Sequence, residues 1–182
     1  MKKRILSLLA ACATMLGLAM FAPATAVAAP YCGIHWGSMP ESASATSSAQ
    51  VEDLRTGRHA CFDRLVVDLE GDVSGYTVKY VNRVDALGSG AAVPLSGGAD
   101  LAILVDAPAH DGSGRATYAP RDRSHAVDVT GYRTFRQVAF TGSFEGQTQI
   151  GLGVRARLPM RVFTLDGPGD GSRLVIDVAH RW

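Results

Sequence analysis

From Phe62 to the C-terminus the chain is divided into short apolar segments whose residues alternate between two faces, and this pattern constrains the fold most. A period of two is typical of a β-strand with one buried face. Glycine, proline and aspartate separate the segments, and only residues 120–131 would tolerate a short helix. The expected strands lie within DRLVVDLE, YTVKYV, DLAILVDAP, TFRQVAFTGSF, TQIGLGVRARL, RVFTLDG and SRLVIDV. Short strands at this spacing predict an all-β protein, a sandwich or a barrel.

Two of these segments repeat one another, because Arg-Leu-Val, an aliphatic residue and Asp occur in FDRLVVDLEG and again, 109 positions later, in GSRLVIDV. In each copy the alternation places the leucine row on one face and Arg and Asp on the other. The Arg and Asp of one copy, Arg64 with Asp68 or Arg173 with Asp177, are four residues apart, about 13 Å along a strand. They are therefore too far apart to pair with each other.

The same segments carry a family resemblance. RVFTLDGPGDGSRLVIDV resembles the closing hairpin of AMIN domains, and FDRLVVDLEG is similar to their first core strand. FTGSFEGQTQIGLGV and RLPMRVF resemble the AMIN-like branch found in secreted actinobacterial proteins. The resemblance covers roughly residues 61–182 and is strongest in the last forty.

AMIN domains are β-sandwiches of two symmetry-related sheets, and they act as cell-wall targeting modules beside periplasmic N-acetylmuramoyl-L-alanine amidases and secretin-type proteins. The resemblance implies a pseudo-symmetric sandwich with one copy of the repeat in each sheet, related by an approximate twofold, and each Arg/Asp face outward. A second arrangement stays open. If the two strands were antiparallel neighbours, Arg64 would face Asp177 and Asp68 would face Arg173, which would make the repeat a charge-matched strand pair without a binding role.

The first 28 residues have the organisation of a cleaved export signal. Residues 2–4 are basic, residues 5–21 are largely apolar, and residues 26–28 have the small residues of a signal-peptidase site. Cleavage after Ala28 would leave 154 of the 182 residues, a single-domain length. An alternative is a lipoprotein, because LAAC ends at Cys12 in the pattern of a lipobox. Both interpretations predict a secreted or cell-envelope protein.

Charge argues against nucleic acid and anionic membranes as partners, and hydropathy argues against a transmembrane span in the mature chain. Cleavage removes three of the 18 basic residues and none of the 17 acidic ones, so the net charge becomes −2. A chain this close to neutral, without a basic cluster, is a poor candidate for binding nucleic acid or an anionic membrane. After the signal, no segment approaches the roughly 20 apolar residues of a transmembrane span.

Cleavage also leaves Cys32 and Cys61 as a pair in an oxidising compartment, which predicts a disulfide. The bridge would cross residues 40–50, a small polar stretch expected to be an exposed loop. It would hold the segment around Trp36 against the domain as a lid. The predicted organisation is a signal peptide (1–28), a disulfide-linked N-terminal segment and Ser/Ala-rich loop (29–60), and an AMIN-like β-sandwich domain (61–182).

The sequence carries no catalytic signature: Gly-x-Ser-x-Gly, His-Glu-x-x-His and phosphate-loop motifs are all missing. The histidines are His35, His59, His110, His125 and His180. None lies at metal-ligand spacing from another, so we expect neither a metal nor a cofactor. His110-Asp111 and Ser124-His125 could supply a hydrolase triad on paper, but many chains rich in Ser and Asp permit this. We expect a non-catalytic protein.

The strongest ligand-binding candidates are Arg64, Asp68, Arg173 and Asp177. An arginine fork recognises carboxylates, such as the stem-peptide acids of peptidoglycan, and an aspartate accepts hydrogen bonds from sugar hydroxyls and amides. The competing interpretation is that they form cross-strand ion pairs on a solvated sheet, each contributing well under about 1 kcal/mol.

Weaker candidates lie in the β-rich centre of the chain. Phe144 and Glu145 stand between glycines, where an exposed aromatic beside a carboxylate suits sugar stacking; the alternative is a hairpin corner with Phe144 turned inward. Gly151 and Gly153 share the face of Arg155, opposite the apolar row. They would either leave backbone open to a ligand or mark a tight crossing of strands.

The sequence therefore predicts a secreted, non-catalytic cell-envelope module that binds peptidoglycan or an associated cell-wall glycan. The alternative is an extracellular protein-interaction module, an inhibitor or assembly factor without glycan binding, that uses sheet edges or the Trp36 segment.

Overall fold

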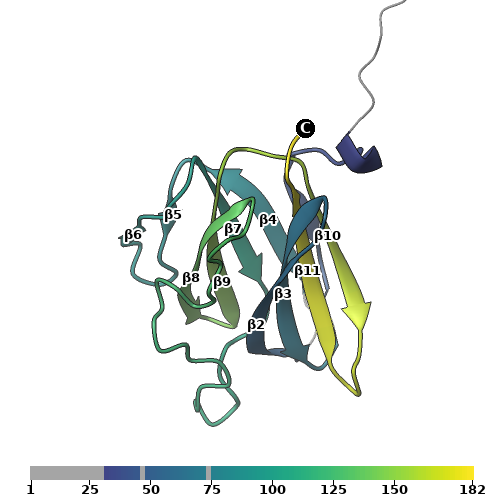
Figure 1. The fold of residues 1–182 in the computed structure, drawn as a ribbon. Coiled ribbons are helices and arrows are strands. Elements are labelled where there is room, and N and C mark those ends of the chain that lie inside the picture. Colours follow the sequence, from purple (N-terminus) through teal and green to yellow (C-terminus); the bar gives the residue numbers. More distant parts are fainter. Residues whose placement is uncertain (1–30, 46–47, 73–74) are drawn as a thin grey trace, which may run out of the picture.

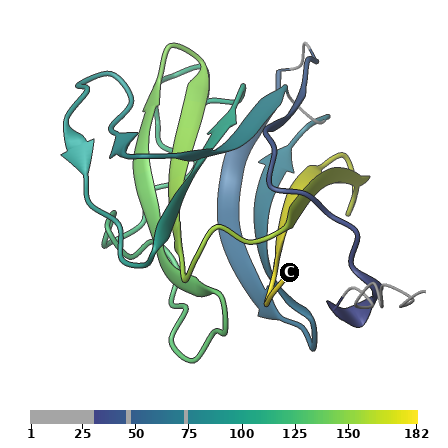
Figure 2. The ribbon, with the colours of Figure 1, turned by 90° about the horizontal axis from the view of Figure 1, so that it is seen from above.

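The computed structural model describes residues 31–45, 48–72 and 75–182. The predicted signal peptide and Cys12 lie outside the described residues. Two antiparallel sheets pack face to face (Figures 1 and 2), one with strand order β1-β4-β7-β9-β8 and one with order β10-β11-β3-β2. The strands are β1 (Glu41–Ala43), β2 (Gln50–Arg58), β3 (Phe62–Glu70), β4 (Tyr76–Val81), β5 (Val84–Asp85), β6 (Ala92–Val93), β7 (Ala99–Val105), β8 (Phe135–Phe144), β9 (Gln147–Val154), β10 (Met160–Asp166) and β11 (Ser172–Ala179). The prediction of an all-β sandwich is confirmed.

The apolar rows of the repeated segments form one side of the core. The leucine row of β3 and the matching row of β11 are almost fully buried. These side chains are Leu65, Val67, Leu69, Leu174, Ile176 and Val178. Strands β7 and β9 of the other sheet supply Leu101, Ile103, Ile150, Leu152 and Val154. Each such side chain contributes about 1.5–3 kcal/mol when it is buried, so the assignment of faces by alternation is confirmed.

The predicted placement of the two copies in different sheets is wrong. Strands β3 and β11 are antiparallel neighbours in the four-stranded sheet, with Arg64 opposite Asp177 and Asp68 opposite Arg173. Alternation fixes which face a residue occupies but not which strand lies beside it. In the antiparallel register each arginine faces an aspartate, and this favours the pairing electrostatically.

The edge strand β2 was missed by the sequence analysis. Val51 and Leu54 are buried, but they are three positions apart and break the period of two. A bulge between Val51 and Asp53 inserts one extra residue against β3 and restores the alignment. The irregular pattern that hid the strand is therefore a consequence of the bulge.

The segment 31–43 closes one open side of the sandwich. Strand β1 pairs with β4 at the edge of the five-stranded sheet, so part of the expected loop 40–50 is a short strand. The Glu41 carboxylate accepts a hydrogen bond from the Val162 backbone N–H on β10, the edge of the other sheet, at 3.1 Å. Gly37 forms a bridge with Met160 at the start of β10. The segment therefore covers one edge of each sheet.

The loop 106–134 closes the opposite side. Val51 on β2 donates its N–H to Pro108 and accepts from the Thr117 hydroxyl, while Phe140 on β8 donates to the Arg123 carbonyl. The short helix allowed within 120–131 does not form in this loop. Asp122 and Asp128 instead accept hydrogen bonds from N–H groups two residues further on, the turn geometry that competes with helix.

Candidate functional site

The outer face of the four-stranded sheet carries a charged row of three side chains. Arg161 on β10 and Arg64 on β3 flank Asp177 on the central strand β11. Arg64 donates from Nε and Nη2 to the two oxygens of Asp177 at 2.6 and 2.9 Å. Arg161 adds a further hydrogen bond from Nε to Oδ2 at 2.9 Å. One carboxylate therefore holds two guanidinium groups side by side.

Asp177 is fully buried although it lies on the outer face, because the two arginines cover it. The Arg64 side chain is 24% exposed and the Arg161 side chain 42%. The hydrogen bonds to Asp177 raise the pKa of Arg64 above its usual value, and partial burial opposes the rise. The row has a net charge of +1, and its positive groups face the solvent.

Three aromatic rings surround the two guanidinium groups. Arg161 lies 4.4 Å from the ring centre of Trp36 and 5.0 Å from that of Phe163. Arg64 lies 5.3 Å from Phe62 and 5.4 Å from Phe163. We call these five residues, with the Asp177 beneath them, the arginine–aromatic surface.

Most of the close arginine–aromatic contacts in the described residues gather on this surface. A cation within about 6 Å of an aromatic ring centre is attracted to the face of the ring. The described part of the chain has nine pairs, and five of them belong to this surface. Sequence alternation could place Arg64 and Asp177 on this face, but Trp36 comes from outside the sheet.

The predicted disulfide brings Trp36 to the sheet. Cys32 and Cys61 are bonded, with their Cα atoms 6.1 Å apart, and Cys61 directly precedes β3. Trp36 packs edge-to-face on Phe62, the first residue of β3, with ring centres 5.5 Å apart. The expectation that Trp36 packs on the body of the protein is confirmed, and it completes the arginine–aromatic surface.

The second Arg/Asp pair of the repeat behaves differently. Asp68 accepts two hydrogen bonds from Arg55 on β2, each 2.5 Å long, which raise the pKa of Arg55. Arg173, directly opposite Asp68, donates instead to the backbone oxygen of Asp166 at 2.9 Å. The four candidates therefore lie on one face, as two unlike arrangements at opposite ends of a strand pair.

The remaining candidates lie away from this face. Phe144 ends β8 and Glu145 begins the β8–β9 turn, and Phe144 is 49% exposed and does not turn inward. A Cβ on Gly88 would lie 3.2 Å from Phe144, so the ring leans on the loop after β5. Arg155 donates to the backbone oxygen of His180 and has a structural partner there.

Gly151 and Gly153 mark a close approach of the chain to itself. A Cβ on Gly153 would lie 2.1 Å from the Ser96 oxygen, and one on Gly151 would lie 3.1 Å from the Leu95 side chain. The loop after β6 therefore crosses directly over β9. These glycines permit packing and do not open the backbone to a ligand.

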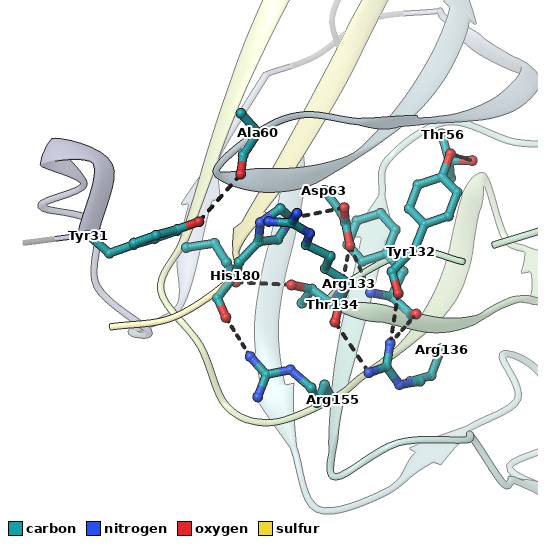
Figure 3. A network of polar contacts seen from close by, with 12 residues as sticks. Tyr31, Thr56, Ala60, Asp63, Tyr132, Arg133, Thr134, Arg136, Arg155 and His180 are labelled. Carbon is teal, nitrogen blue, oxygen red and sulfur yellow. Dashed lines mark hydrogen bonds and ion pairs between the residues drawn. The ribbon is translucent and has the colours of Figure 1, made fainter. Parts of the chain in front are cut away.

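A buried polar cluster lies at the end of the core and was missed by the sequence analysis. Asp63 is 1% exposed and His180 is 6% exposed, and Asp63 Oδ1 lies 3.1 Å from His180 Nε2. Asp63 Oδ2 accepts from the N–H groups of Thr134 and Phe135. Figure 3 shows the two side chains pointing toward each other, with Arg155 reaching the His180 carbonyl. A sequence signal existed, because both residues continue the buried rows of β3 and β11.

The residues that could supply a hydrolase triad, His110-Asp111 and Ser124-His125, do not form one. The His110 ring approaches the carbonyl oxygen of its neighbour Asp111, and the exposed His125 ring pairs with Asp122. The Asp111 carboxylate accepts from Ser113 and Arg115, and these bonds lower its pKa to about 2. His110, Asp111 and His125 thus each contact a partner within their own turn.

The family model of the AMIN-like domain matches residues 49–180, nearly all of the two sheets. The chain belongs to the AMIN-like domain family. Comparisons with curated proteins and with solved structures gave no match. AMIN-like domains are generally non-catalytic binding modules of the cell envelope, and the Cys32–Cys61 disulfide fits an oxidising compartment.

Membrane-spanning helices and metal sites are two further features to consider in this AMIN-like chain. Among residues 31–45, 48–72 and 75–182, no helix is long and apolar enough to cross a membrane. Within the same residues, no three His, Cys, Asp or Glu side chains form a group that could hold a metal ion.

Proposed function

We propose that this AMIN-like protein is an exported, non-catalytic module that binds peptidoglycan or an associated cell-wall glycan through the arginine–aromatic surface. Export would follow cleavage after Ala28. The observation that carries the proposal is the pair Arg64 and Arg161, held over one buried carboxylate and framed by three aromatic rings.

This arrangement suits the chemistry of the wall polymer. Sugar rings present apolar faces that pack on aromatic side chains, while the carboxylates of muramic acid and of stem peptides suit guanidinium forks. Asp177 occupies Nε and Nη2 of each arginine, which leaves Nη1 of both without a protein partner among the described residues. Because Asp177 also fixes the guanidinium groups in place, a ligand would not have to order them.

The test is co-sedimentation of the purified protein with insoluble peptidoglycan. We expect Arg161→Ala and Trp36→Ala each to weaken sedimentation by about tenfold, because each removes a charge-assisted or stacking contact. Arg121→Ala is the matched control, since Arg121 is exposed in the loop 106–134. The Arg161 variant should unfold at nearly the wild-type urea concentration, because Arg64 still pairs with Asp177.

Failure of the wild-type protein to sediment would overturn the proposal. In that case the surviving interpretation is a protein-interaction module without glycan binding. Equal losses in Arg161→Ala and Arg121→Ala would show that sedimentation depends on net charge and not on this surface. N-terminal sequencing of exported protein tests the cleavage site: a lipid-modified start at Cys12 would replace the proposed start at Ala29.

A further inference from the structure

A groove of about 700 Å³ lies at the other end of the same sheet face, beside the β10–β11 turn. Its charged lining residues are Glu52, Asp53, Arg55, Asp68, Asp166 and Arg173. The groove therefore combines four carboxylates with two guanidinium groups, and their pairing decides what it can bind.

Among the described residues, Arg173 has no acidic partner. A guanidinium group has five N–H donors, and within this part of the chain Arg173 donates one hydrogen bond, from Nη2 to the Asp166 backbone oxygen. Its Nε is buried without a hydrogen-bond partner. A buried donor without a hydrogen-bond partner lowers the stability of the fold, and the loss is larger when the group is charged. Within the described part of the chain, Arg173 is thus a cation without a carboxylate partner.

The carboxylate that faces Arg173 across the strands does not pair with it. Asp68 is bound at both oxygens by Arg55, which reaches over from β2. That pair is internally neutral, so it leaves Arg173 as the free positive group of the groove.

The free negative groups belong to the other three acids. Glu52 and Asp166 are exposed, and among the described residues their carboxylates have no partner. Asp53 accepts from the Leu54 N–H through one oxygen and also interacts electrostatically with Arg55. The groove therefore displays groups of both signs on separate strands, and among the described residues Arg173 forms no ion pair with any of the acids.

We propose that this groove binds a zwitterion, a free α-amino acid or a dipeptide, whose carboxylate and ammonium groups lie close together. The carboxylate would pair with Arg173, and the ammonium group with Asp53 and Asp166. A simple anion would pair with Arg173 but meet the excess of acids, while a simple cation would pair with the acids but leave Arg173 without a partner. A zwitterion satisfies both signs at once. This site is separate from the arginine–aromatic surface and does not depend on wall binding.

The probe is diglycine, titrated into the purified protein and followed by the amide NMR signals of residues 52–55 and 166–173. N-acetyl-diglycine and diglycinamide each keep one of its two charges. We expect saturable shifts with diglycine and binding at least about tenfold weaker for each capped analogue, because each capped analogue leaves one set of groove charges unpaired.

Two variants locate the site. Arg173→Gln should weaken diglycine binding by about tenfold or more, and Asp166→Asn, a change at an exposed carboxylate, should weaken it several-fold. Arg121→Gln is the matched control and should bind as the wild type does. If the Arg173 variant proves unstable, the Asp166 variant alone carries the test.

The proposal is overturned if diglycine causes no saturable shifts, if the capped analogues bind equally well, or if the groove variants bind like the control. Co-sedimentation with peptidoglycan tests the proposed function separately, so a failure of the groove proposal can be told from a failure of the proposed function. Loss of diglycine binding in Arg173→Gln with wall binding retained supports two separate sites. Loss of wall binding in Arg161→Ala, with diglycine binding retained, supports the same division.

Discussion

Arg64 and Asp177 lie directly opposite each other on β3 and β11 and are joined by two hydrogen bonds of 2.6 and 2.9 Å. The same register places Arg173 opposite Asp68, yet these two do not bond, because Arg55 holds Asp68. A repeat that looks symmetric in sequence is thus used in two ways. At one end Asp177 bonds both Arg64 and Arg161 beneath aromatic rings, and at the other Arg173 has no carboxylate partner among the described residues.

Replacing Asp177 should destabilise the fold. Asp177→Asn removes the negative charge between Arg64 and Arg161 and leaves two guanidinium groups facing each other. Breaking a buried ion pair costs about 3–5 kcal/mol; because both arginines are partly exposed, we expect about 2–3 kcal/mol. Urea unfolding measures this, with Asp170→Asn on the exposed turn as the control. A loss below about 0.5 kcal/mol, the range of ordinary surface changes, would contradict the stabilising role of Asp177.

Removal of the disulfide should loosen the segment 31–43 and lower stability. In the chain-entropy model a bridge closing a loop of this size contributes about 3–4 kcal/mol. We expect the variant with both Cys32→Ser and Cys61→Ser to unfold at lower urea and to be cleaved faster by protease within residues 34–40. Reduced wild-type protein should match the double variant. Unchanged protease resistance would show that the strand contacts alone hold the segment.

The turn that follows His110 should loosen in acid. Hydrogen bonds from the Ser113 hydroxyl and the Arg115 backbone lower the Asp111 pKa from 3.8 to about 2. Because the folded-state pKa lies below the ordinary value, the ionised carboxylate favours the turn above about pH 4, and this support is lost as the pH falls through about 2. NMR titration of the Ser113 and Arg115 amides should show a midpoint near pH 2. A midpoint near 4 would mean that the turn does not hold the ionised form.

Gly153→Ala should be strongly destabilising. The new Cβ would lie 2.1 Å from the Ser96 backbone oxygen, so the loop over β9 would have to move. We expect a loss of about 2 kcal/mol or more, in the range of overpacking changes. Gly112→Ala is the matched control, because no atom lies within 4 Å of its added Cβ, and it should change the unfolding midpoint little. Similar midpoints for both variants would show that the loop yields easily.

The sequence was sufficient for the fold class and for the faces of β3 and β11, because both depend on local alternation. It could not decide strand neighbours. Arg64 and Asp177 would lie on an outer face in either arrangement, and only the pairing of the whole sheet shows that they bond to each other. The sequence signal for this pairing was that, in an antiparallel register, each arginine of one copy faces an aspartate of the other.

Other parts of the site depend on contacts between distant segments. Trp36 reaches the sheet through a disulfide and a single bridge at Gly37. The competition of Arg55 for Asp68 arises on β2, a strand hidden by its bulge. Asp63 and His180 were detectable as polar residues in buried rows, whereas their partner N–H groups at Thr134 and Phe135 were not.

The closure of both open sides also bears on solubility. An uncovered strand edge is a template on which another chain can add a strand, and sheet proteins avoid aggregation by hiding such edges. Here the segment 31–43 covers the edges of both β4 and β10. Strand β1 pairs with β4, and the Glu41 carboxylate accepts a hydrogen bond from the Val162 N–H on β10. Because the Cys32–Cys61 bridge ties this segment to the start of β3, we expect reduction of the bridge to uncover both edges and to promote edge-to-edge self-association.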